Sequence, residues 1–318
     1  MFRSKPKNST GVHFGDDALH LVELSAAGGE IALQNMVSLE LPSKIQTMTP
    51  ADPRIAEAMV LLLRTARRDH GITFQNPYVA LHSRSFLLKR RALAKGGMNE
   101  SREQLEWEAS QFLADEEDAF AFDFLVAGGF GFVVAARRTA IDWMRLMCDD
   151  ADIDKPGFDV APFALFNALE SSGAATHAAK QLLVDVDRLE ARLVLISSSG
   201  LAGYETCRWD RREPLATAAT ANSTKDAGQQ IDSSAQLDLL VQAMERLESN
   251  GGDSGVERIW VSGDEAAMWC EPIAKRTSVV TAPLNPFATL TSGGAPDDTS
   301  AAAYSTAAGL AFRGLSEA

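Results

Sequence analysis

Apolar residues alternate with polar ones in the opening segment of the chain. Residues 11–14 and 19–24 form two short apolar stretches with a polar turn between them, and the leucine, isoleucine and valine residues of 31–41 all share one parity. A period of two is typical of half-buried strands. Gly28 and Gly29 supply a second turn. The pattern therefore predicts a three-stranded meander.

A helical pattern follows the meander. Asp52 is suited to cap a helix, Pro53 to begin it and Gly71 to end it. The apolar residues between them recur every three or four positions and would form one face of the helix: Ile55, Met59, Leu62, Leu63 and Ala66.

Residues 77–134 have the pattern of a separate small unit. The expected elements are a helix at residues 103–114 and strands at 79–82, 86–90, 120–126 and 132–136. Ser101 and Gln104 would open the helix as a capping box. The glycine-rich residues 128–131 lie between two strands with no helix after them. They therefore predict a hairpin turn rather than a phosphate-binding loop.

The strand pattern of the opening restarts near residue 181. Strands are expected at residues 182–186, 192–197 and 203–207, which repeats the meander. A repeated unit predicts two similar halves with a cleft between them. The expected halves are residues 9–76 with 135–176, and residues 177–318.

The other elements of the two halves follow from the same patterns. Residues 208–235 are rich in Ala, Thr, Ser, Asp and Gln without periodicity, which predicts a loop-like lobe. Helices are expected at residues 139–149, after Pro162, and at 236–247, 264–274 and 300–312, with strands at 258–261 and 277–281.

Composition narrows the classes of partner. Of the 318 residues, 46% are hydrophobic and 23% charged, and the net charge is −13. These values are those of a globular protein. The acid excess argues against a broad nucleic-acid-binding surface, which needs a basic face. It also argues against direct docking onto anionic lipid.

We infer the cellular compartment from the absence of a signal-peptide pattern and of a membrane-spanning pattern in the sequence. No apolar stretch follows the basic residues at the start, and no charge-free apolar run reaches the length of about 20 residues that a spanning helix needs. The three cysteines, Cys148, Cys207 and Cys270, are far apart and odd in number. Such cysteines suit buried thiols in a reducing compartment. We therefore expect a cytoplasmic protein.

Common enzyme patterns do not fit the sequence. The five histidines show no metal-ligand spacing, and there is no Walker loop and no nucleophile-elbow serine. The acidic run 115–118 suits a solvated loop better than a metal site. We therefore expect no catalytic residues and no metal site.

The repeated meander suggests a different kind of site. Two strand–turn–strand units can clamp the phosphates of a nucleotide between them, and a third turn can hold the adenosine. The candidate turns are residues 15–17, 185–187 and 262–264. Their candidate binding residues are Gly15, Asp16, Asp185 and Gly263. For Asp185, a strand-end residue that caps a turn is the alternative to a magnesium ligand.

Two motifs resemble one known family. Residues 11–25, Gly-Val-His-Phe-Gly-Asp-Asp-Ala-Leu-His-Leu-Val-Glu-Leu-Ser, resemble the opening of the PilM family, the actin-like, FtsA-related proteins of type IV pilus assembly. Residues 104–112, Gln-Leu-Glu-Trp-Glu-Ala-Ser-Gln-Phe, resemble that family's distinctive Gln-hydrophobic-Glu-Trp-Glu-Ala helix. Later segments resemble the family in the same order, at residues 133–138, 160–165, 284–287 and 307–315. The resemblance implies an actin-like (ribonuclease-H-like) α/β fold of two similar halves, with residues 77–134 as an inserted small α+β subdomain.

The sequence departs from the family at each nucleotide turn. His13 and His20 stand where the family usually has Asp and Lys, and the second turn lacks the family's Gly and Thr. Asp187 would lie near phosphate oxygens, where repulsion at ~4 Å costs about 1 to 4 kcal/mol. Asp264 follows Gly263 where a second Gly is usual, and the 208–235 lobe is shorter than the family's. We therefore expect no cofactor and no ATPase activity, with binding of ATP and magnesium as the alternative.

The resemblance also implies a partner. PilM-family proteins are cytoplasmic scaffolds that bind the N-terminal peptide of the inner-membrane protein PilN in a groove beside the inserted subdomain. Other proteins of the pilus platform are further expected partners, and contact with the membrane would be indirect. The candidate partner-binding residues are Leu105, Trp107 and Phe112, with core packing as the alternative for Trp107. The acid excess favours a basic peptide.

Two rival interpretations remain. The first is an ATP-binding actin-like protein. The second is GspL, the related cytoplasmic scaffold of type II secretion. That family continues into a transmembrane helix, and this sequence ends at Ala318 without one, so we expect the pilus protein.

Overall fold

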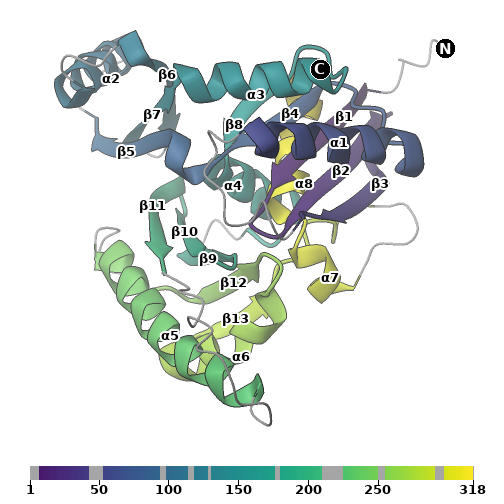
Figure 1. Ribbon diagram of the computed structural model, residues 1–318. Helices are drawn as coiled ribbons and strands as arrows, with labels where there is room; N and C mark the ends of the chain where they lie inside the picture. The colour runs from purple at the N-terminus through teal and green to yellow at the C-terminus, as the bar shows by residue number, and fades with distance from the viewer. Residues whose placement is uncertain are drawn as a thin grey trace.

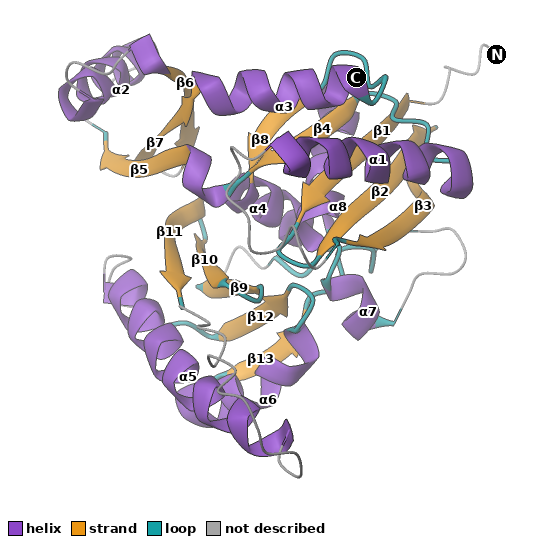
Figure 2. Cartoon of the chain, viewed as in Figure 1, coloured by secondary structure: helices purple, strands orange, loops and turns teal. Residues whose placement is uncertain are grey.

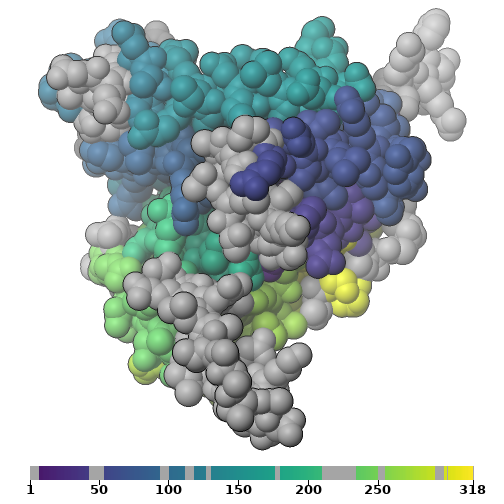
Figure 3. Space-filling model, in the orientation of Figure 1, coloured from purple at the N-terminus to yellow at the C-terminus, as the bar shows by residue number. Residues whose placement is uncertain are grey.

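The computed structural model describes residues 7–42, 53–93, 98–113, 118–127, 130–175, 180–209, 225–249, 255–290 and 297–317. Two halves, each built around a sheet, lie one above the other, and a small subdomain projects at the upper left (Figure 1). Figure 3 shows the wide upper part, made of the first half and the subdomain, and the narrower second half below it.

The two main sheets have the same topology. The first has the order β3-β2-β1-β4-β8, and the second has the order β11-β10-β9-β12-β13. In each sheet the meander is antiparallel and the last two strands are parallel to the first strand of the meander. The repeat predicted from the sequence is therefore confirmed. The strands are β1 Lys7–Phe14, β2 Ala18–Ala27, β3 Glu30–Glu40, β4 Pro77–Leu81 and β8 Gly157–Val160, then β9 Gln181–Val186, β10 Glu190–Ser197, β11 Gly200–Arg208, β12 Arg258–Ser262 and β13 Val280–Pro283.

Helices cover both faces of each sheet (Figure 2). α1 (Pro53–His70) and α3 (Arg138–Asp150) pack on the outer face of the first sheet. α4 (Ala161–Ser171) and α8 (Ser305–Glu317) lie between the two sheets. α5 (Lys225–Ser249) and α6 (Ala266–Thr277) cover the outer face of the second sheet, and α7 (Asp298–Ala302) precedes α8.

A bulge in β3 changes which face its side chains occupy. The pairing of β2 with β3 shifts register between Glu23 and Leu24. As a result Ile31 packs with α8, whereas Val37 packs with α1 and α3 on the opposite face. The shared parity of these residues had predicted a single buried face. That prediction is wrong, because one extra residue in a bulge reverses the alternation.

The predicted loop-like lobe and the closing helix have different boundaries, whereas α1 ends as predicted. α5 begins at Lys225, inside the segment expected to be a loop-like lobe, while residues 210–224 lie outside the described residues. The closing helix is divided into α7 and α8. Gly71 follows α1 with a φ of 71°, as expected for a helix end, but Asp52 lies outside the described residues.

α8 belongs to the first half in space, although it follows the second half in sequence. It packs on β1, β2 and β4 and crosses α4 closely. At the crossing, a Cβ on Gly309 would stand 1.7 Å from the carbonyl oxygen of Ala164. The absence of a side chain at this position is therefore what allows the two helices to meet. The predicted extent of the second half, residues 177–318, is therefore wrong at its end, because α8 packs with the first half.

The inserted subdomain is a three-stranded sheet with one helix. Its strands β5 (Phe86–Ala92), β6 (Phe120–Ala127) and β7 (Phe130–Arg137) have the order β5-β7-β6, and α2 (Met98–Leu113) covers one face. Antiparallel β6 and β7 confirm the predicted hairpin, whose turn residues 128–129 lie outside the described residues.

Two details of this subdomain differ from the prediction. β4, which we expected inside the subdomain, pairs in parallel with β1 and β8 and belongs to the first sheet. The subdomain therefore begins at β5 and extends through β7. α2 begins before Ser101, which is buried inside the helix, so the predicted capping box is wrong. Among the helices that the structure describes, none is both long and apolar enough to span a membrane.

Candidate functional site

The three predicted turns meet at the junction between the two halves, where the repeat predicts a cleft; we call this junction the cleft. Asp16, in the β1–β2 turn, accepts a hydrogen bond through Oδ2 from the backbone N–H of Leu189 in the β9–β10 turn, at 2.8 Å. Ser262, at the end of β12, donates its hydroxyl to Oδ1 of Asp185 at 2.7 Å. The structure thus brings Gly15, Asp16, Asp185 and Gly263 to one place, each on a turn or strand end.

Position 263 requires a glycine because two turns approach each other closely there. Its φ is 94°, and a Cβ there would stand 2.1 Å from the carbonyl oxygen of Val186. Its N–H donates to the carbonyl oxygen of Ala302 at 3.1 Å. Only glycine combines this backbone conformation with that contact. In this arrangement, Gly263 serves the packing of the third turn on the second.

Arg192 is a buried cation of this site that the sequence patterns did not indicate. Its guanidinium is buried, donates from Nε to Oδ2 of Asp185 at 2.8 Å, and forms a second ion pair with Asp187. Glu190 lies 3.7 Å from Nη1. The sequence did contain a signal, because Arg192 is a basic residue beside the apolar run 193–196, and one tight turn separates this strand from Asp185. β-Sheet register places the two directly opposite each other.

Burial shifts the pKa of several groups in the cleft. Burial raises the pKa of Asp187 well above its usual value; the guanidinium of Arg192 opposes this change, and the nearby carboxylate of Asp185 adds to it. Burial also raises the pKa of Asp16, although the N–H of Leu189 opposes this change. Burial and the charge of Arg192 together lower the pKa of His13. The cleft therefore holds a poorly solvated group of acids, of which Asp185 and Asp187 share the cation of Arg192.

The two histidines lie side by side at the N-terminal end of α8. The ring centroids of His13 and His20 are 6.2 Å apart, and the edge of Tyr304 meets His20 at 5.2 Å. His20 Nε2 lies 3.1 Å from Asp264, which belongs to the third turn. Within the described ranges, no cluster of three or more His, Cys, Asp or Glu side chains could hold a metal ion.

Three backbone N–H groups of the two turns predicted to bind phosphate have partners within the protein. Gly15 donates to the carbonyl oxygen of Ala18 at 2.9 Å, and Asp187 donates to that of Glu190 at 2.9 Å. Leu189 donates to Asp16, as described above. Anion-binding turns hold phosphate oxygens through free N–H groups and cations. Here the N–H groups of Gly15, Asp187 and Leu189 are used by contacts within the protein.

The predicted partner-binding residues divide into buried and exposed side chains. Leu105 is fully buried and packs with Ala109 and Val133 in the core of the subdomain. The prediction that Leu105 faces a partner is therefore wrong, because α2 turns that side chain toward the sheet. Trp107 is 65% exposed, which excludes core packing. The side chain of Phe112 lies outside the described residues.

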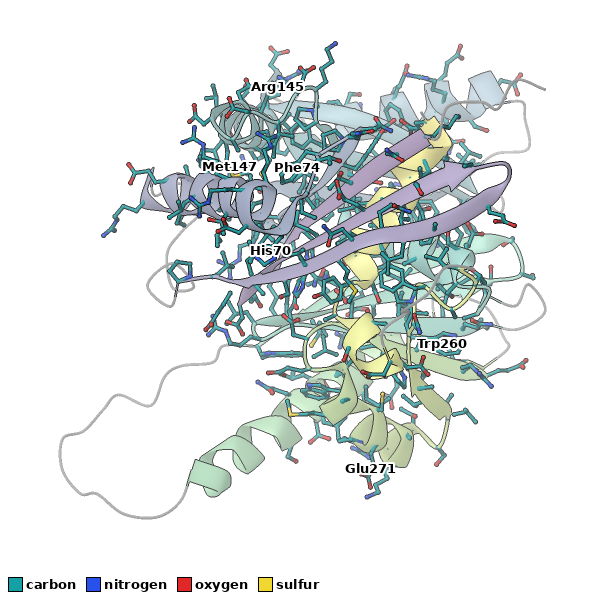
Figure 4. All side chains as sticks on the ribbon, turned by 90° about the vertical axis from the view of Figure 1, so that its right-hand side faces the viewer. His70, Phe74, Arg145, Met147, Trp260 and Glu271 are labelled. Atoms are coloured by element: carbon teal, nitrogen blue, oxygen red, sulfur yellow. The ribbon has the colours of Figure 1, made fainter. Side chains whose placement is uncertain are left out.

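A shallow pocket of about 450 Å³ lies far from the cleft. It is formed between α5 and α6 by Leu237, Met268, Glu271, Pro272, Lys275 and Arg276. Figure 4 shows Glu271 at the lower end of the second half, opposite Arg145 and Met147 of the first half. The predicted site residues do not contribute to this pocket.

Comparison with known proteins identifies the fold of this chain. No family model and no curated protein matches the sequence. The chain of a solved "PilM-PilN type IV pilus biogenesis complex" is similar in structure, with a TM-score of 0.72 and 20% identity over 96% of this chain and 98% of that one. The match spans both halves and the inserted subdomain.

Two further solved structures are more distant. A Bacteroides thetaiotaomicron protein described as having an actin-like ATPase fold has a TM-score of 0.49 and 8% identity, covering 88% of this chain and 91% of that one. The cytoplasmic domain of EpsL, from the type II secretion system of Vibrio cholerae, has a TM-score of 0.46 and 13% identity, covering 80% and 82%. Neither carries an argument about function. The topology and the first comparison together establish that this chain has the actin-like fold predicted from its sequence.

Proposed function

We propose that this chain is a non-catalytic adaptor of type IV pilus assembly that binds the N-terminal cytoplasmic peptide of a PilN-like inner-membrane protein. The observation that carries the proposal is the structural similarity to a PilM-PilN complex, which extends over 96% of the chain and includes the inserted subdomain. The partner would bring the protein to the inner membrane, so that the adaptor itself need not touch lipid.

The exposed face of α2 suits a peptide partner. Trp107 is 65% exposed on this helix, and Glu103 lies one turn before it on the same face, also exposed. Exposed tryptophans are frequent anchors of protein interfaces. Glu106 precedes Trp107 in the chain and is also exposed, and it pairs with Arg102 at 2.9 Å. An aromatic side chain among carboxylates favours a peptide with both apolar and basic residues.

The contacts in the cleft support the second part of the proposal, the loss of nucleotide binding. Phosphate would have to displace Asp16 from the N–H of Leu189 and would meet the carboxylates of Asp185 and Asp187. Breaking this hydrogen bond and approaching two carboxylates are both unfavourable for the binding of an anion. ATPase activity is therefore not part of the proposed function.

Isothermal titration calorimetry with the N-terminal peptide of the PilN-like protein encoded by a neighbouring gene tests this proposal. We expect the wild-type protein to bind and Trp107→Ala to weaken binding about tenfold or more, since truncating an interface tryptophan commonly costs about 2 kcal/mol. Met268→Ala is the matched control, because Met268 is also 65% exposed but lies on α6. Neither heat nor a thermal shift with the wild-type protein would count decisively against the adaptor.

A second candidate is an ATP-binding actin-like protein. The convergence of the β1–β2, β9–β10 and β12–α6 turns on one cleft favours it, because this is where an actin-like protein would hold a nucleotide. Gly15, Asp185 and Gly263 would then contact the ligand. A thermal-shift titration with Mg-ATP separates this candidate from the adaptor.

A further inference from the structure

Among the described residues, four polar contacts join the strands and turns of the first half to those of the second. Two connect the β1–β2 turn with the β9–β10 turn, one connects β2 with the turn after β12, and one connects the segment after β4 with β10. They are Asp16 with the N–H of Leu189 at 2.8 Å, Asp17 with Arg188 at 2.8 Å, His20 with Asp264 at 3.1 Å, and Ser83 with Glu190 at 2.9 Å.

The β9–β10 turn is itself fixed to the second half. Trp209 is buried, and its indole N–H donates to the carbonyl oxygen of Arg188 at 2.8 Å. The backbone N–H of Trp209 donates to the carbonyl oxygen of Leu189 at 3.1 Å. Two consecutive residues of the turn are thus tied to the end of β11. A contact that the turn makes with the first half therefore holds the whole second half.

Arg192 makes this arrangement electrostatically possible. The turn carries Asp185 and Asp187 into a buried region close to Asp16, and like charges there would repel. Arg192 pairs with both of these carboxylates. A buried guanidinium thus balances these acids. The cation comes from the chain and is always present.

We propose that Asp16 and Asp17 of the first half, with Arg188 and Leu189 of the second, form a latch that holds the cleft closed without a ligand. Clefts that close around a ligand depend on it for closure. In this protein the contacts across the cleft are internal, so closure is a constant property of the fold. This inference stands on the cross-cleft contacts alone, and it can fail while the peptide-binding function holds.

Distances between spin labels on the two halves test the latch. Arg145→Cys on α3 and Glu271→Cys on α6 supply exposed sites at opposite ends of the molecule (Figure 4), with Cys270→Ser removing the partly exposed native thiol. We expect one narrow distance distribution, unchanged by Mg-ATP. Arg188→Ala combined with Asp16→Ala should broaden it or shift it to longer distances, while Arg188→Lys should retain the narrow form.

Arg276→Ala is the matched control. It removes an arginine that pairs with Asp238 at 3.1 Å within the second half, and should leave the distribution unchanged. If the double variant does not fold, judged by circular dichroism, Arg188→Ala alone gives the test, because this side chain is partly exposed. A distribution that stays narrow without the latch, or a wild-type distribution that shifts with Mg-ATP, would overturn the proposal. Calorimetry with the peptide on the same variants reports the adaptor function separately.

Discussion

At the residue scale, a few buried charged side chains determine much of how this protein behaves. Arg192, Asp185 and Asp187 form one such group, and Asp159 with Arg313 forms another, at 3.3 Å between β8 and α8. The sequence pattern places Asp185 and Arg192 on strands. It does not show which are buried, because burial of a charge depends on the partner that compensates it.

Asp159 gives a prediction for the pH dependence of stability. Burial raises its pKa from 3.8 to about 6, although Arg313 opposes this change. Between about pH 4 and pH 6 the native state therefore binds more protons than the unfolded state, so the free energy of unfolding falls as the pH rises through this window. At about 1.4 kcal/mol per pKa unit, the loss from this group is at most about 3 kcal/mol.

Denaturant unfolding of wild type and Asp159→Asn at several pH values from 4 to 7.5 measures this effect. Asn cannot ionise, yet it keeps an oxygen that can accept the N–H of Val160. We expect the wild type to lose stability relative to the variant as the pH rises. Asp142→Asn, an exposed carboxyl on α3, should follow the wild type. A constant difference between wild type and Asp159→Asn across the range would refute the assignment.

At the scale of elements, periodicity predicted most strands and helices, and long-range contacts corrected their ends. Both meanders, α1 and the β6–β7 hairpin lie where the pattern placed them. The bulge in β3 and the early start of α2 were not predicted. A bulge has no strong sequence signature, and Ser101 resembles a cap until its burial inside the helix is known.

The crossing of α4 and α8 supports a prediction at this scale. Gly309→Ala would place a Cβ 1.7 Å from the carbonyl oxygen of Ala164, so the helices must separate. We expect a loss of about 1 to 3 kcal/mol in the free energy of unfolding, measured with denaturant. Gly255→Ala is the control, because a Cβ there would meet nothing within 4 Å. Equal stability of the two variants would show that the crossing can relax.

At the scale of the whole molecule, the internal repeat predicted two halves and a cleft. The three candidate turns meet there, as the repeat implied. Arg188 and Arg192 were missed, although they supply the cations of the cleft. Their roles depend on which turns face each other across the cleft. A local sequence pattern does not show which turns these are.

The closed cleft predicts the response of the whole molecule to ATP. A ligand at one hundred times its Kd raises the free energy of unfolding by about 2.7 kcal/mol, which a thermal-shift assay detects as a rise of a few degrees. We expect no rise in Tm for the wild type at millimolar Mg-ATP. A concentration-dependent rise would instead support the ATP-binding candidate.

The sequence by itself determined the elements, their repeat and the positions of the turns, because periods of two and of three to four residues and turn residues act locally. Only the tertiary structure decided that β4 joins the first sheet, that α8 returns to the first half, and that Trp107 is exposed while Leu105 is buried. It also decided that Arg188 and Arg192 balance the acids of the cleft. These outcomes depend on contacts between residues far apart in the chain, which are fixed only when the sheets, the crossing helices and the turns pack together.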